Sequence, residues 1–151
     1  MLAIVVDIDN TLFDSTERWN VCQQQFKKKS EIWNCFFDPE KLSLDKPIFD
    51  VINIVRQHRN NGYKVIIVTG RLEKLKEATI EQLKKFNIPF EMIFFRKEKD
   101  FRKDYEFKSE IVAELIKMGY KIELVIDDSE EVRKAVQQLG IKAIDPAEIL
   151  K

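Results

Sequence analysis

The sequence predicts an α/β protein built on a doubly wound, Rossmann-like parallel sheet of about five strands. Short apolar runs of strand length recur along the chain, amphipathic segments of helix length separate them, and turn-forming residues stand at the junctions. Strands that alternate with helices form a parallel sheet covered on both faces, and right-handed crossovers lead to the doubly wound arrangement. We expect the 151 residues to form one domain, 1–151, without repeats or linkers.

The predicted strands are the short apolar runs of the sequence, because such runs suit strands that are buried on both faces. In chain order they cover 2–6, 63–69, 89–95, 121–126 and 141–144. Gly70 and Arg71, which follow the second run, are predicted to form a turn.

The predicted helices carry apolar residues at helical spacing. They cover 16–30, 47–61, 72–86, 107–118 and 129–139, and a last helical turn is expected over 146–150. Pro47 suits the first turn of its helix, Gly62 the position after its end, and Ser129 an N-cap. The segment 16–46, which is helical and then irregular and aromatic, is expected to be a small insertion, too short for a large cap domain.

The composition narrows the classes of function. Lys and Arg number 26, as do Asp and Glu, so the net charge gives no global attraction for nucleic acid or membranes. No apolar run is long enough to cross a bilayer, and the first residues carry no signal-peptide pattern. Cys22 and Cys35 lack metal-site spacing, so we expect free thiols in a reducing cytoplasm. We therefore expect a cytoplasmic protein without an obligate protein partner.

Chemically useful residues stand just after three of the predicted strands. The first strand is followed by Asp7 and Asp9, the second by Thr69–Arg71, and the fourth by Asp127 and Asp128. A lone Asp-x-Asp could simply cap the next segment, but parallel strands bring their carboxyl ends to one ligand-binding edge. Carboxylates about 5 Å apart repel by roughly 3 kcal/mol at an effective dielectric near 20, so such a cluster needs a cation or shifted pKa values. Oxygen ligands favour Mg²⁺, which commonly binds a substrate phosphate as well.

A carboxylate nucleophile beside a phosphate also needs nearby positive charge. Lys108, Arg71 and Arg18 are the candidates. Lys108 could be a solvated lysine at a helix start. However, a lysine in a first turn opposes the helix dipole, which favours a functional reason for its position.

Four ordered motifs resemble the haloacid dehalogenase (HAD) superfamily of phosphohydrolases. They are DIDNT at Asp7–Thr11, VTGR at Val68–Arg71, Lys108, and VIDD at Val125–Asp128. The chain is more narrowly similar to the 3′-phosphatase domain of phage-type polynucleotide kinase. Arg18 stands eleven positions after Asp7, and RKDYEFK at Arg102–Lys108 matches a basic loop of the form RKDxxxK. Asn10 departs from the glycine often found there, and the segment 18–47 is longer than in that domain.

The resemblance implies a catalytic role for four residues. Asp7 would attack phosphorus and form an aspartyl-phosphate. Asp9 would protonate the leaving oxygen and then deprotonate the attacking water. Thr69 would hydrogen-bond the phosphate, and Lys108 would neutralise the nucleophile and the intermediate.

The resemblance also implies ligands for substrate and metal. Arg18 and Arg71 would grip the phosphate or the substrate beside it, Asp104 would orient Lys108, and Asn10 and Gly70 are further substrate-site candidates. The expected Mg²⁺ ligands are Asp7, the backbone carbonyl of Asp9, and one or both of Asp127 and Asp128.

We therefore expect a Mg²⁺-dependent phosphomonoesterase, and polynucleotide 3′-phosphatase activity on nucleic-acid 3′ ends is the narrower hypothesis. A HAD phosphatase of a small phosphorylated metabolite or nucleotide is the alternative. A phosphoacceptor signalling domain is disfavoured because the acid pair comes last in the chain, and a non-catalytic domain because all motif residues are present. No P-loop motif is found, so no kinase half is expected.

Two further expectations concern residues outside this site. The four aromatic residues Trp19, Trp33, Phe36 and Phe37 are expected to form a small cluster that closes the insertion. His58 is expected to be exposed and to take no part in catalysis.

Overall fold

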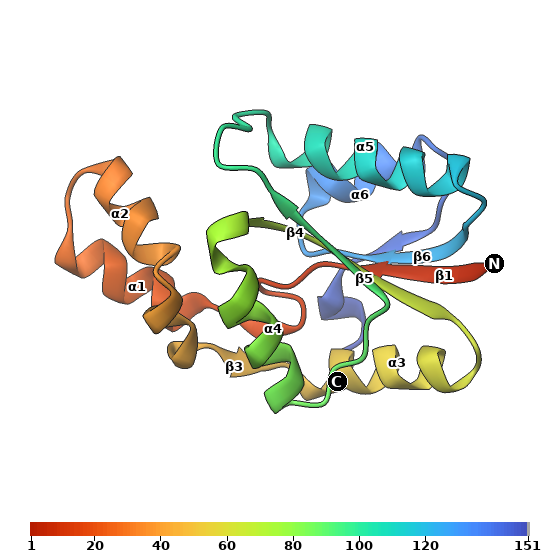
Figure 1. The fold of residues 1–151 in the computed structure, drawn as a ribbon, viewed down its shortest axis with the longest axis horizontal. Coiled ribbons are helices and arrows are strands. Elements are labelled where there is room, and N and C mark those ends of the chain that lie inside the picture. Colours follow the sequence, from red (N-terminus) through yellow and green to blue (C-terminus); the bar gives the residue numbers. More distant parts are fainter. Residues whose placement is uncertain (151) are drawn as a thin grey trace.

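A five-stranded parallel sheet forms the centre of the computed structural model, which describes residues 1–150 (Figure 1). The strands follow the order β5–β4–β1–β6–β7 across the sheet. Their bounds are β1 Leu2–Val6, β4 Lys64–Leu72, β5 Met92–Arg96, β6 Lys121–Ile126 and β7 Ala143–Ile144. The chain winds outward from β1 through β4 to β5, then returns to the other side of β1. The predicted doubly wound α/β fold is confirmed.

Helices cover both faces of the sheet. α5 (Asp104–Lys117) and α6 (Glu130–Gln137) lie on one face, and α3 (Phe49–Asn60) and α4 (Lys76–Lys85) on the other (Figure 1). Successive residues of β1 point to opposite faces, so Ile4 and Val6 pack with α3 while Ala3 and Val5 pack with α5. The central strand is thereby buried on both sides, which fixes its carboxyl end and the residues after it.

The segment between β1 and α3 projects beyond the end of the sheet (Figure 1). It contains α1 (Thr16–Gln25), α2 (Lys29–Phe36) and a 3₁₀ helix (Pro39–Leu44), flanked by the short antiparallel strands β2 (Phe13–Asp14) and β3 (Lys46–Pro47). The expected single helix over 16–30 is therefore two helices, because the backbone of Phe26 is extended and interrupts the first one.

The prediction of free thiols is wrong, because Cys22 on α1 and Cys35 on α2 form a disulfide with their Cα atoms 5.6 Å apart. The predicted aromatic cluster is confirmed. Trp19, Trp33 and Phe36 contact one another with ring centroids 5.0–5.7 Å apart, and Phe37 stacks on Trp33.

Several predicted boundaries shift in the structure. The predicted turn at Gly70 and Arg71 is wrong, since β4 continues through both residues to Leu72 after an irregularity in its pairing with β5. The next helix begins with a short 3₁₀ turn, Glu73–Leu75, ahead of α4. α5 starts at Asp104, three residues earlier than predicted. A 3₁₀ turn, Pro146–Glu148, follows β7, as expected.

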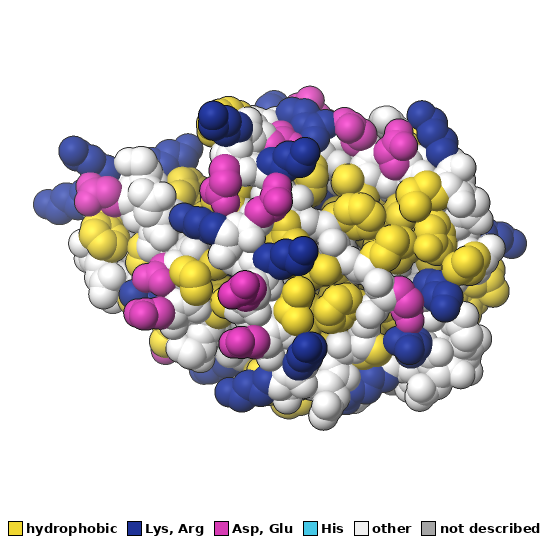
Figure 2. All heavy atoms as spheres, viewed as in Figure 1, with side chains coloured by type: hydrophobic (Ala, Val, Ile, Leu, Met, Phe, Trp, Pro, Cys, Tyr) yellow, Lys and Arg dark blue, Asp and Glu magenta, His cyan; other side chains and the backbone are white. Residues whose placement is uncertain are grey.

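Figure 2 shows apolar side chains gathered along the middle of one face, over the edge strand β5. The five residues of this strand are all half-buried.

The prediction that His58 is exposed is wrong, because the residue is half-buried. Its Nδ1 lies 2.8 Å from the carbonyl oxygen of Ile54. Over residues 1–150, no helix combines the length and hydropathy that a bilayer crossing requires.

Candidate active site

Asp7 stands at the carboxyl end of the central strand and is almost fully buried, with 6% of its surface exposed. Its backbone N–H still donates to Ile126, so the β1–β6 ladder holds the residue in place. Thr11 donates to one carboxylate oxygen over 3.1 Å, and the Nζ of Lys108 donates to the other over 2.8 Å. Both oxygens of the expected nucleophile are thus oriented by neighbouring side chains.

Lys108 is the cation at the centre of the site. Its Nζ lies 2.8 Å from carboxylate oxygens of Asp7 and Asp127 and 3.3 Å from Asp104, one turn earlier on α5. Burial opposes the charged form, but the charges of Asp7 and Asp127 outweigh it and hold the pKa of Lys108 well above its usual value. With 4% of its surface exposed, Lys108 is not the solvated lysine that its helix position also allowed.

Three carboxylates from opposite ends of the chain converge beside this lysine. Asp7, Asp127 and Asp128 each offer an oxygen within 4.8 Å of the others, as adjacent β1 and β6 require. Burial, with the nearby charge of Asp7, raises the pKa of Asp127 to about 7 and raises that of Asp128 as well. The raised carboxylate pKa values indicate that the single positive charge of Lys108 does not offset the negative charges of all three carboxylates. Three oxygen ligands with surplus negative charge fit a hard divalent cation such as Mg²⁺.

The side chain of Asp9 faces away from these acids and lies between two arginines. Arg71 donates to both of its oxygens, over 3.2 Å from Nε and 2.9 Å from Nη2, and Nη2 of Arg18 donates to one of them. Burial alone would raise the pKa of Asp9, but the charges of Arg71 and Arg18 lower it below its usual value. Any metal contact from Asp9 therefore has to come from its backbone, as the resemblance implies.

Arg18 and Arg71 are fully buried, and their guanidinium groups are directed at protein acceptors. Both donate to Asp45, over 3.0 Å from Arg18 and 3.1 Å from Arg71. Arg71 also donates to Thr79 and to Gln82. In this structure the two arginines, which are expected to bind the phosphate or the substrate beside it, hold the carboxylates of Asp9 and Asp45.

Sequence reasoning missed the partners in this network. Asp45 lies in the irregular segment before β3, and Thr79 and Gln82 lie on α4, away from any strand end. Gln82 also donates to Asp45 over 3.0 Å. The only feature of the sequence that could have indicated these partners is a polar residue at a core-facing position of a helix. Thr79, which is fully buried, stands at such a position.

The other predicted site residues surround this centre. Thr69 is buried within β4, where its hydroxyl accepts a hydrogen bond from the backbone of Arg71. Asn10 has a φ of 61°, which turns the chain sharply, and its side chain accepts from Ser15 at the start of α1. Asn10 thus connects the catalytic loop to the insertion.

Gly70 permits a close approach between β4 and α5. A Cβ atom at this position would lie 2.8 Å from Oδ1 of Asp104, so the Asp104 carboxylate would have to shift. Asp104 pairs with Lys108 and, over 2.8 Å, with Arg96. The glycine therefore leaves room for the Asp104 carboxylate beside Lys108.

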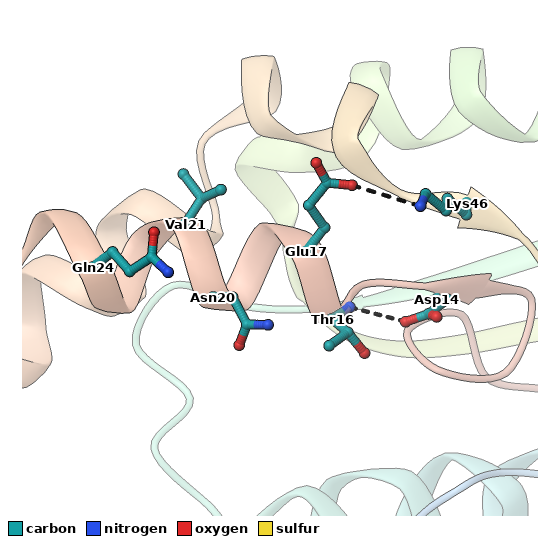
Figure 3. A pocket seen from close by; sticks show the side chains of 7 residues that line it. All are labelled: Asp14, Thr16, Glu17, Asn20, Val21, Gln24 and Lys46. Carbon is teal, nitrogen blue, oxygen red and sulfur yellow. Dashed lines mark hydrogen bonds and ion pairs between the residues drawn. The ribbon is translucent and has the colours of Figure 1, made fainter.

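A hollow of about 460 Å³ lies along α1 (Figure 3). It is lined by one face of the helix and by two residues of the β2–β3 pair. The lining residues are Asp14, Thr16, Glu17, Asn20, Val21, Gln24 and Lys46. Its amide, hydroxyl and carboxylate groups can form hydrogen bonds with a polar molecule.

The two arginines at the ends of the basic loop between β5 and α5 are held by contacts with other side chains. Arg102 pairs with Asp100 over 2.8 Å and also with Glu110. Arg96 lies over the ring of Phe107, 5.1 Å from its centroid. These contacts hold the loop in a defined shape at the edge of the site.

Comparison with known proteins identifies the family. The family described as "Polynucleotide kinase PNKP phosphatase domain" matches residues 1–148. In a Pnkp1/Rnl/Hen1 complex, one chain matches 95% of this chain with a TM-score of 0.75 and 24% identity. Only 45% of that longer chain is covered, so this chain spans less than half of it.

Solved phosphatases share the same fold. A class C acid phosphatase from Bacillus anthracis matches with a TM-score of 0.68 and 19% identity over 95% of this chain and 65% of its own. The HAD-like hydrolase SP0104 from Streptococcus pneumoniae matches with a TM-score of 0.66 and 12% identity over 93% and 82%. At such identities the likeness concerns the fold alone, whereas the family match spans nearly every residue. The chain belongs to the HAD phosphatases, in the family of PNKP phosphatase domains.

Proposed function

We propose that the chain is a Mg²⁺-dependent phosphomonoesterase that acts through an aspartyl-phosphate on Asp7. The observation that carries the proposal is the convergence of Asp7, Asp127 and Asp128 around Lys108. A carboxylate nucleophile approaching a phosphate dianion needs cationic neighbours, and phosphoryl transfer depends mainly on such positioning and charge compensation.

In the first step, Asp7 attacks phosphorus and the alcohol leaves. The Nζ of Lys108 stays beside the attacking carboxylate and offsets the negative charge that gathers there. Mg²⁺, held by Asp7, the Asp9 backbone carbonyl and Asp127 or Asp128, would polarise the phosphoryl oxygens as a Lewis acid. Thr69, on the strand that pairs with β1, would donate a hydrogen bond to the phosphate.

Asp9 serves the proton transfers. The resting carboxylate is ionised, because Arg71 and Arg18 lower its pKa. An ionised Asp9 suits the second step, in which water loses a proton as it attacks the aspartyl-phosphate. For the first step Asp9 must gain a proton, and the negative charge of an arriving phosphate favours that gain.

The experiment is an Asp7→Asn variant, which keeps the shape of the side chain and removes the nucleophile. We expect turnover to be lost, and ³²P label from substrate to be trapped on the acid-quenched wild-type protein but not on the variant. Asp50→Asn is the matched control, because Asp50 is exposed in the first turn of α3 and belongs neither to the acid cluster nor to the lining of the hollow along α1. Wild-type turnover by Asp7→Asn would refute the assignment.

For the substrate, we propose a nucleic-acid 3′ end. The family match supports this proposal, and the hollow along α1 offers polar side chains for the rest of such a substrate. The test compares kcat/KM for an oligonucleotide carrying a 3′-phosphate with that for the same oligonucleotide carrying a 5′-phosphate, alongside sugar and nucleotide monophosphates. A clear preference for a small metabolite would favour the alternative substrate class.

A further inference from the structure

The Cys22–Cys35 disulfide lies next to the residues that hold Asp9. Cys22 follows Arg18 by one turn of α1, and Cys35 directly precedes Phe36 on α2. Both half-cystines are buried, Cys22 completely and Cys35 to within 8%. The bond therefore joins, inside the insertion, the two helices that carry Arg18 and Phe36.

Phe36 contacts Arg18 through both its backbone and its ring. The Phe36 carbonyl accepts a hydrogen bond from Nη1 of Arg18 over 2.9 Å, and the ring centroid lies 4.0 Å from the guanidinium carbon. Arg18 in turn donates to Asp9. Direct contacts thus connect the disulfide to the proton-transfer carboxylate, through one aromatic residue and one arginine.

α2 depends on its contacts with α1 to stay in place. The helix is eight residues long, and a helix of this length is marginal without tertiary contacts. The apolar cluster of Cys22, Cys35 and Phe36 is separate from the two cores that flank the sheet. Trp19 of α1 also contacts the rings of Trp33 and Phe36 on α2. The disulfide adds a covalent bond to these packing contacts between the two helices.

We propose that the Cys22–Cys35 disulfide is a positioning element for proton transfer, holding Phe36 against Arg18 so that Arg18 aligns Asp9. This inference rests on the proposed role of Asp9 in the phosphatase reaction. It concerns the alignment of one carboxylate and leaves Asp7, Lys108 and the acid cluster unaffected, because none of these contacts the insertion helices.

The proposal predicts an effect that depends on the leaving group. A sugar hydroxyl is a weak acid and needs a proton as it departs, whereas p-nitrophenolate leaves without one. The constant kcat/KM depends only on the steps up to departure of the alcohol. Its value is therefore not affected by the rate at which the intermediate is later hydrolysed. A misaligned Asp9 should therefore lower kcat/KM for a nucleoside 3′-monophosphate far more than for p-nitrophenyl phosphate.

The experiment compares wild-type protein, purified without reductant, with a Cys22→Ala/Cys35→Ala double variant. We expect kcat/KM for the nucleoside 3′-monophosphate to fall about tenfold or more, and that for p-nitrophenyl phosphate to change by less than about threefold. Ile32→Ala is the matched control, since Ile32 packs on the same apolar cluster but contacts neither Arg18 nor Asp9. It should leave the ratio of the two constants unchanged.

Each of four results would overturn the proposal. Alkylation of the non-reduced wild-type protein that labels both cysteines would show that the bond does not form. Equal losses on the two substrates in the double variant would show a general loss of active protein. An unchanged ratio in the double variant, with a shifted ratio in Asp9→Asn, would remove the disulfide's role and leave that of Asp9. If Asp9→Asn itself leaves the ratio unchanged, the proposed proton transfer fails, and this inference with it.

Discussion

Replacing Arg71 with Met should cost the fold about 3 to 5 kcal/mol. The guanidinium is completely buried and donates to Asp9, Asp45, Thr79 and Gln82. Met fills a similar volume but carries no charge, so the negative charges of Asp9 and Asp45 lose one of their two arginine partners. Removing one partner of a buried ion pair costs about 3 to 5 kcal/mol. Arg18 still contacts both carboxylates, which argues against a larger loss.

The variant should stay folded under ordinary conditions, so this loss can be measured by unfolding it. A domain of this size is stable by roughly 5 to 15 kcal/mol, so most molecules should stay folded at 25 °C. The expected fall in Tm is about 6 to 20 °C, and urea titration followed by circular dichroism gives the free energy of unfolding. The control is Arg59→Met, because Arg59 pairs with Glu91 at the surface and should contribute less than about 1 kcal/mol. If Arg71→Met lies within 1 kcal/mol of the wild type, the network does not stabilise the fold as argued.

Two further predictions concern the acid cluster and its lysine. In EDTA, the free energy of unfolding should fall as pH rises from about 4 to 7. Burial raises the pKa of Asp127 in the folded protein to about 7, whereas its value in the unfolded chain is about 3.9. The stabilisation from the protonated Asp127 is therefore fully present only below about pH 3.9 and is lost as pH rises through about 7. Thermal melts should show this slope, and saturating Mg²⁺ should flatten it; a slope that Mg²⁺ does not change would argue against metal binding at Asp127. Gly70→Ala should lower kcat about tenfold or more with little change in Tm, because its Cβ would displace Asp104 from Lys108. Wild-type kcat in this variant would show that Asp104 does not position the lysine.

The parts of the site that the sequence predicts are those that follow from sheet topology. Asp7 and Asp127 stand directly after apolar runs, and neighbouring parallel strands necessarily bring such positions together. Lys108 required the motif resemblance, because a lysine early in a helix has no periodicity that points inward. The structure shows that its long side chain reaches from α5 to the ends of β1 and β6.

The parts that could not be predicted depend on tertiary packing within irregular or polar segments. Asp45 follows a 3₁₀ helix, and nothing in its local sequence signals that two arginines converge on it. The pairing of Cys22 with Cys35 depends on the antiparallel placement of two short helices, and the sequence suggested only one. The sequence predicts a turn after Thr69 because glycine is common in turns. In the structure the strand continues, and the absence of a side chain at Gly70 makes room for Asp104.

The side chains of Asp7 and Asp9, which both follow the central strand, contact different sets of residues. Asp7 faces Lys108 and Thr11, whereas Asp9 faces Arg18 and Arg71. Ile8, completely buried between them, anchors the loop in the core and keeps the two groups apart. Substitutions in the projecting helices would therefore change the surroundings of Asp9, through Arg18, and leave the hydrogen bonds of Asp7 in place.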